Sequence, residues 1–111
     1  MGWLKRRVSK SRADVKVRSE DRELDDALRE HLESFIATRK GVEAWVETPT
    51  SFNKASILLI AADGEWTRRS VPSTAWAHKL AERHSLPSYD AGVVGYPQRM
   101  RDWNARQKRA R

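Results

Sequence analysis

The sequence predicts an α+β fold with a small three- to four-stranded mixed sheet. The expected order is helix, three antiparallel strands, helix and short strand, followed by a basic C-terminal helix. Three observations predict it: an amphipathic helical period, two extended runs joined at Asp63-Gly64, and helical periods that return near residues 74 and 97. The 111 residues leave room for one domain with one modest core.

The first helix is expected over residues 21–39. Leu24, Leu28, Leu32 and Phe35 recur at spacings of three and four residues, which places them on one face of a helix. Acidic residues crowd its first turns, where the helix dipole stabilises negative charge. The preceding segment is polar and basic without a sustained period, so a flexible basic arm is predicted there.

The sheet is predicted from three extended segments. Residues 42–48 alternate between apolar and polar side chains, as in a half-buried strand. Residues 55–62 are nearly all apolar, which is typical of a central strand covered on both faces. Asp63-Gly64 favours a type I′ turn, so residues 65–71 should return antiparallel with Ala61 opposite Trp66.

The C-terminal third predicts two helices and a short strand. Ser73 is a suitable N-cap for a helix over residues 74–84. Residues 88–94 predict the last strand, and Pro97 is suited to the first position of a third helix.

The net charge of +7 lies at the two ends of the chain. Residues 1–19 carry seven basic residues and one acidic residue, and residues 99–111 carry six and one. Residues 20–98 carry nine basic and thirteen acidic residues. The expected organisation is therefore a basic arm, a mildly acidic domain and a basic C-terminal helix or tail. Clustered cations gain free energy by displacing counterions from phosphates, so a polyanion partner is expected.

Several classes of chemistry lack their usual residues in this chain. There is no cysteine, which excludes disulfides and thiolate metal sites and fits a reducing cytoplasm. No apolar run is long enough for a transmembrane helix, and no secretory signal is predicted. The histidines, serines and glycines lack the spacings of zinc sites, nucleophile elbows and phosphate-binding loops. We expect neither a metal nor a cofactor, and a role other than catalysis.

One catalytic alternative stays open. The predicted order of elements is similar to that of restriction-endonuclease-like nucleases, whose metal-binding acids would fall near Asp63 and Glu65. The lysine of such a site is replaced by Thr67, and the neighbouring Arg68 cannot lose its proton to act as a base. A turn also explains Asp63, so this alternative ranks low.

The basic and aromatic side chains are the candidate contacts to nucleic acid. Trp66 and Arg68 share one face of the return strand, and Arg69 points to the other. Such a surface can stack bases and bind phosphates, but a helix over Trp66 and an edge strand protected by arginines would explain the same residues. The candidates are Lys5, Arg6, Arg7, Lys10, Arg12, Trp66, Arg68, Arg69, Arg99, Arg101 and Arg106.

Residues 95–104 combine two aromatic side chains, a methionine and two arginines behind a rigid turn. Tyr96, Met100 and Trp103 could anchor in the groove of a partner, which makes an acidic protein the alternative partner. They could equally dock the last helix on its own sheet. A docked helix is expected to present Arg99, Arg101 and Arg106 outward.

The leading hypothesis is a non-enzymatic module that binds RNA or a ribonucleoprotein. No helix-turn-helix or zinc finger is evident, which argues against reading a specific DNA site. Attachment to anionic lipid through Trp3 and Leu4 ranks below the nucleic-acid and adaptor hypotheses. Trp45 points away from Val42, Ala44 and Val46, so either a helix covers it or it joins an exposed aromatic patch.

Three segments also resemble a known family. They are GVEAWVE at 41–47, AADGEWTRR at 61–69 and GYPQRMRDW at 95–103. They look like a small actinobacterial family of about this size, whose members are labelled oxidoreductase or left uncharacterised. The likeness covers roughly residues 20–104 and implies a bacterial cytoplasmic origin. Nothing in this chain supports a redox role, because cysteine pairs, dinucleotide fingerprints and metal-ligand spacings are missing.

Overall fold

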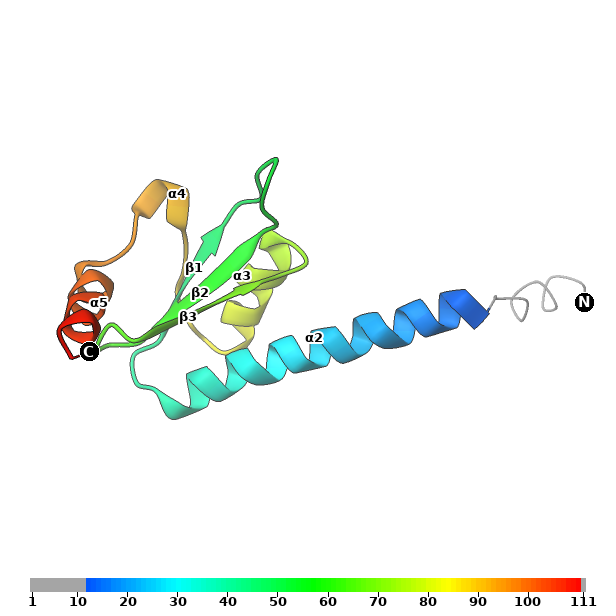
Figure 1. Ribbon diagram of the computed structural model, residues 1–111, viewed down its shortest axis with the longest axis horizontal. Helices are drawn as coiled ribbons and strands as arrows, with labels where there is room; N and C mark the ends of the chain where they lie inside the picture. Colours follow the sequence, from blue (N-terminus) through cyan, green and yellow to red (C-terminus); the bar gives the residue numbers. More distant parts are fainter. Residues whose placement is uncertain (1–11, 111) are drawn as a thin grey trace, which may run out of the picture. The chain divides into compact units, whose positions relative to one another are not determined.

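The computed structural model describes the backbone of residues 12–110 and the side chains of residues 24–110 (Figure 1). It confirms the predicted α+β class, with a four-stranded mixed sheet and a C-terminal helix. The elements are α2 (Arg12–Thr38), β1 (Glu43–Glu47), β2 (Ser56–Ile60), β3 (Trp66–Ser70), α3 (Thr74–Arg83), β4 (Ser88–Asp90), α4 (Ala91–Val94) and α5 (Gln98–Arg109). None of the helices in this described part is both long and apolar enough to span a bilayer.

The strand order across the sheet is β3-β2-β1-β4. β2 pairs antiparallel with both of its neighbours, while β4 runs parallel to β1. Every residue of β2 is buried, which confirms the predicted central strand. β3 lies at one edge of the sheet and β4 at the other.

The two faces of the sheet differ in composition. Ala44, Val46, Ile57 and Leu59 are buried on the apolar face. Helix α3 and the last turns of α2 cover this face with five buried side chains: Leu32, Phe35, Ala77, Leu80 and Ala81. The opposite face, here the aromatic face, carries Trp45, Leu58, Ile60, Trp66 and Tyr89 and packs against α4 and α5.

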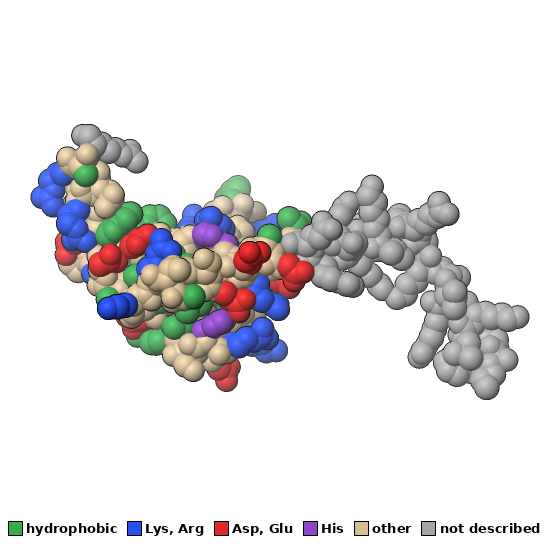
Figure 2. Space-filling model, turned by 90° about the horizontal axis from the view of Figure 1, so that it is seen from below, with side chains coloured by type: hydrophobic (Ala, Val, Ile, Leu, Met, Phe, Trp, Pro, Cys, Tyr) green, Lys and Arg blue, Asp and Glu red, His purple; other side chains and the backbone are tan. Residues whose placement is uncertain are grey.

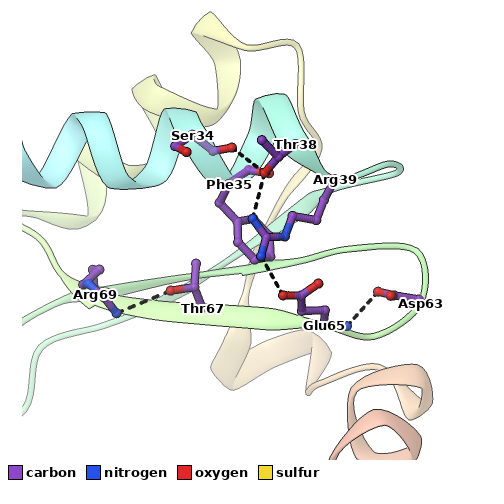
Figure 3. Close-up of polar contacts among 8 residues, drawn as sticks. All are labelled: Ser34, Phe35, Thr38, Arg39, Asp63, Glu65, Thr67 and Arg69. Atoms are coloured by element: carbon purple, nitrogen blue, oxygen red, sulfur yellow. Dashed lines mark hydrogen bonds and ion pairs between the residues drawn. The ribbon is translucent and has the colours of Figure 1, made fainter.

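Arg39 ties the end of α2 to the β2–β3 hairpin (Figure 3). Its guanidinium lies 4.6 Å from the centre of the Phe35 ring and pairs with Glu65 at 2.7 Å. A further hydrogen bond of 2.7 Å joins Arg39 to Thr38. The Arg39 guanidinium therefore covers the Phe35 ring and also pairs with the Glu65 carboxylate next to the hairpin turn.

The first helix begins earlier than predicted. α2 starts at Arg12 rather than near residue 21, so residues 12–19 are helical rather than irregular. Residues 12–19 lack the repeating apolar face that predicts the rest of the helix, although Arg, Ala and Lys are good helix formers. Residues 1–11, the rest of the arm predicted over residues 1–19, lie outside the described residues. The chain divides into two compact units, Met1–His31 and Leu32–Arg111. Within the first unit, Arg29 forms an ion pair with Asp25 at 3.2 Å.

The register predicted for the hairpin is wrong by one residue. Ile60, not Ala61, lies opposite Trp66, and Leu58 pairs with Arg68 rather than with Arg69. The turn has three loop residues: the Gly64 N–H donates to the Ala61 carbonyl at 2.9 Å, and Gly64 alone takes a positive φ, +94°. A type I′ turn would also require positive φ at Asp63. The Asp63 carboxylate instead accepts the Glu65 N–H at 3.0 Å.

The C-terminal elements follow the prediction with one difference. The Ser73 hydroxyl caps α3 by accepting the Trp76 N–H at 3.0 Å, as predicted. Strand β4 ends at Asp90 instead of continuing to residue 94, because the Asp90 side chain caps α4 through the Gly92 N–H at 2.9 Å. Pro97 occupies the N-cap of α5 rather than its first helical position, which is Gln98.

Candidate nucleic-acid interface

Trp45 lies at the centre of the aromatic face and is covered. Its side chain is 3% exposed, its ring centre lies 4.9 Å from that of Tyr89, and its Nε1 donates to the Gly95 carbonyl at 2.9 Å. Of the two outcomes expected for Trp45, the structure therefore shows burial and not an exposed aromatic patch. The segment that leads into α5 provides part of this cover.

Two carboxylates from β1 organise the polar contacts on the same face. Glu43 accepts the Tyr89 hydroxyl at 2.6 Å and pairs with Arg99 at 2.6 Å. The Tyr89 hydrogen bond lowers the pKa of Glu43, assisted by Arg99, and the same hydrogen bond raises the pKa of Tyr89.

Glu47 is the second of these carboxylates. It accepts the Tyr96 hydroxyl and pairs with Arg68 at 2.7 Å. Burial raises the pKa of Tyr96 to about 12, with a further contribution from the Glu47 hydrogen bond. A neutral tyrosine that donates to a carboxylate is suited to holding the chain ahead of α5 on the sheet, and not to proton transfer near neutral pH.

Arg99 points inward, so the expectation that it faces outward is wrong. Its Nε donates to the Ala61 carbonyl at 3.0 Å, and its guanidinium lies 5.5 Å from the Trp45 ring centre. Together with the Glu43 ion pair, these contacts hold the Arg99 guanidinium against its own protein. The physical reason is the half-buried Glu43 carboxylate, which is costly to leave without a cation.

Helix α5 docks closely against the hairpin turn. A Cβ atom at Gly64 would overlap the Arg99 carbonyl oxygen and lie 2.9 Å from Trp103 Cβ, so glycine allows this approach. Trp66 is half-buried and donates from Nε1 to Asn104 at 2.8 Å, while Tyr96 and Met100 pack on the aromatic cluster. The predicted platform around Trp66 is thus partly covered by α5.

A groove lies along the C-terminal half of α5. This groove of about 550 Å³ is lined by Trp103, Asn104, Gln107, Lys108 and Ala110. Of the three predicted anchors for a protein partner, only Trp103 lines it, because Tyr96 and Met100 contact the protein's own sheet.

The outer surface of α5 carries the remaining cations of that helix. Arg101, Arg106, Lys108 and Arg109 are exposed, and Figure 2 shows Lys and Arg side chains gathered at this end of the molecule. Arg106 also donates to the Asp63 carbonyl at 2.8 Å. None of the four forms an ion pair with a residue that the structure describes.

A second basic region lies at the opposite end of the hairpin. It is a pocket of about 200 Å³, here the basic pocket, lined by Asn53, Lys54, Ser56, Arg68, Arg69 and Ser70. The pocket forms because Ser56 begins β2 directly opposite Ser70, which ends β3. Antiparallel pairing therefore brings Lys54, just before β2, near the two arginines of the edge strand.

The structure separates the predicted contacts into two groups. Arg68 and Arg69 line the basic pocket, whereas Arg101 and Arg106 lie on α5 near the hairpin turn. Lys5, Arg6, Arg7 and Lys10 lie outside the described residues, and Arg12 begins α2. Sequence reasoning missed Lys54, Asn53, Ser56 and Ser70, although antiparallel pairing of the two predicted strands brings the start of the first to the end of the second.

The acids considered for a nuclease site have other partners. Asp63 accepts the Glu65 N–H within the turn, and Glu65 pairs with Arg39 (Figure 3). Within residues 24–110, no three histidine or carboxylate side chains gather in a way that could hold a metal ion. These contacts account for both acids structurally.

No protein-family model, no curated protein and no solved structure matches this chain. The resemblance of its three segments to an actinobacterial family stays a prediction. The two basic regions, on α5 and around Arg68 and Arg69, are therefore the features that bear on function.

Proposed function

We propose that this protein is a small non-enzymatic module that binds nucleic acid, RNA or a ribonucleoprotein in preference to a specific DNA site. The basic pocket carries the proposal. Three cations, Lys54 from the β1–β2 loop and Arg68 and Arg69 from β3, line one concave surface together with hydroxyl and amide groups. Cations and neutral hydrogen-bond donors in one concavity are the groups that bind phosphate oxygens.

The charge of this pocket is only partly neutralised. Arg68 pairs with Glu47, whereas Lys54 and Arg69 form no ion pair with any described residue. Arg69 instead donates to the Arg68 carbonyl at 2.7 Å and contacts Thr67 (Figure 3). Two cations thus stay available to an anion that enters the pocket.

The separation of the two basic regions favours a polymer over a single phosphate group. The five residues of β2 lie between the pocket and the turn where α5 docks. At about 3.4 Å per residue, such a strand spans about 17 Å. An extended phosphate backbone can contact both regions, whereas a mononucleotide can contact only one. A chain without cysteine fits the cytoplasmic setting that we propose with this function.

A salt titration of binding tests the proposal. We expect the full chain to bind single-stranded RNA with an affinity that falls steeply as salt is added, because counterions return to the phosphates. Duplex RNA and duplex DNA serve as comparison ligands. Absent or salt-insensitive binding to all three would contradict the proposal.

A matched pair of variants tests the pocket itself. Lys54→Ala with Arg69→Ala should weaken binding and reduce the slope of log affinity against log salt by about 1 to 2. The control, Lys79→Ala with Arg83→Ala, removes the same charge from exposed positions of α3. Equal losses in both variants would show that net charge, and not the pocket, determines binding.

The groove beside Trp103 favours a second candidate function, an adaptor for an acidic protein. Lys108 lines this groove and could pair with a carboxylate of such a partner. Trp103→Ala distinguishes the two candidates, because it changes the groove and leaves every residue of the basic pocket in place. Under the nucleic-acid proposal, this variant keeps its affinity for RNA.

A further inference from the structure

Phe52 is the most exposed large apolar side chain among the described residues, with 94% of its surface accessible. It lies in the loop between β1 and β2, immediately before Asn53 and Lys54 of the basic pocket. Removing an aromatic side chain from water is favourable, in proportion to the apolar surface that is buried. Phe52 does not make that gain within its own fold, so it is available to a ligand.

The loop holds Phe52 in a defined position. Thr50 Oγ1 accepts the N–H groups of Phe52 at 3.2 Å and of Asn53 at 3.0 Å. The Thr50 N–H in turn donates to the Asn53 carbonyl at 2.8 Å. These three hydrogen bonds order the loop before any ligand binds, which lowers the entropy cost of binding.

We infer that Phe52 stacks on an unpaired base while the adjacent basic pocket binds a phosphate of the same strand. This inference rests on the proposed function and makes its ligand single-stranded. An aromatic ring beside a cationic groove is the combination by which proteins bind single strands, because every base has a face that can stack. A duplex keeps its bases stacked on one another and leaves none for Phe52.

Other apolar side chains near this end of the sheet define the competing occupant. Val93 and Val94 of α4 are 83% and 57% exposed, and β4 leads into α4 beside the end of β1. With Phe52 they could enter a lipid surface. The cations of α5 lie at the other end of the hairpin from Phe52. One flat membrane would therefore not contact both at the same time. A flexible single strand can reach both ends.

Fluorescence anisotropy with a short single-stranded RNA, and with the same RNA in a duplex, tests the inference. Phe52→Ala should weaken binding of the single strand by about tenfold and leave duplex binding unchanged. Phe52→Trp should retain affinity because it keeps an aromatic face, whereas Phe52→Leu should lose as much as Phe52→Ala. Val93→Ala is the control, an exposed apolar side chain that does not line the pocket, and should bind like the wild type.

The outcomes separate this inference from the proposed function. Wild-type protein that binds neither RNA would contradict both. Wild-type protein that binds RNA while Phe52→Ala matches it would overturn the stacking contact alone. Wild-type RNA affinity in Phe52→Leu would also overturn the stacking contact and point to an apolar contact. Binding to phosphatidylserine vesicles, measured in parallel, would do the same if it were the only binding that Phe52→Ala loses. All variants should keep the wild-type melting temperature, because the replaced side chains are exposed.

Discussion

The apolar face and the aromatic face of the sheet are both covered by helices, but different interactions hold the two covers. On the apolar face, Ala44, Ile57 and Leu59 are completely buried against α2 and α3, so burial of apolar surface dominates. On the aromatic face, Glu43, Glu47, Tyr89, Tyr96 and Arg99 form a hydrogen-bonded layer beneath α4 and α5. The second cover therefore depends on charge, and hence on pH and salt.

This difference bears directly on function. Arg99 belongs to the most basic segment of the chain, yet its charge is used to dock α5. Arg101, Lys108 and Arg109 of the same helix stay exposed. Fewer cations are thus exposed on α5 than its net charge implies. The way in which α5 packs on the sheet determines which of its cations stay exposed.

The largest expected effect comes from breaking the close approach of α5. Gly64→Ala should lower the free energy of unfolding by about 4 kcal/mol, because it adds a positive-φ alanine and an overlap with the Arg99 carbonyl. Gly95→Ala is a matched control: it shares a positive φ, +74°, but its Cβ would meet no atom within 4 Å. We expect it to cost about 1–2 kcal/mol in urea denaturation. Equal costs would show that α5 is not held against Gly64.

The next effect lies on the apolar face. Leu59→Ala should destabilise the protein by about 3 kcal/mol, because it leaves a cavity at a completely buried position. The loss should be nearly independent of salt and of pH between neutral and mildly acidic conditions. A strong dependence on salt would contradict the distinction between the two faces.

A smaller and pH-dependent effect is expected on the aromatic face. Glu43→Gln should cost about 1 kcal/mol at neutral pH, because Arg99 loses its partner while the amide can still accept the Tyr89 hydroxyl. The folded-state pKa of Glu43 lies below its ordinary value of 4.5. Its contribution is therefore complete above that pH and is lost as pH falls through the folded-state pKa. The two proteins should converge in stability in acid.

A double-mutant cycle with Arg99→Gln isolates this ion pair. The double variant should be less destabilised than the sum of the two single variants, because neither single charge is then left without a partner. Strict additivity would indicate that the contact between Glu43 and Arg99 contributes no stability.

The smallest effect at neutral pH concerns Tyr96. Its pKa of about 12 in the folded protein exceeds the ordinary 10.0, so its contribution is complete below pH 10 and is lost as pH rises toward 12. Ultraviolet titration can follow this ionisation, since the chain has only two tyrosines. Glu47→Gln should lower the Tyr96 pKa, while Glu82→Gln, at an exposed position of α3, should leave it unchanged. An unchanged tyrosine titration in Glu47→Gln would exclude Glu47 as a cause of the shift.

Much of the secondary structure could be predicted from local patterns. The buried central strand follows from the apolar run at 57–60, and the start of α3 follows from the Ser73 cap. The hairpin register could not be predicted from Asp63-Gly64 alone, because a two-residue turn and a three-residue turn that ends in a positive-φ glycine both accept this pair of residues. The start of α2 was missed because helix formation at residues 12–19 follows propensity without an apolar period.

Local sequence patterns were enough to predict the fold class, the order of the elements and the excess of positive charge at the two ends of the chain. These depend on side-chain periodicity and composition, which are local properties. Three features became clear only from the packed fold: Arg99 turns inward, Trp45 is buried, and Lys54 joins Arg68 and Arg69 in one pocket. Those outcomes depend on the strand register and on how α5 packs against Gly64. Contacts between residues that are distant in the sequence determine both.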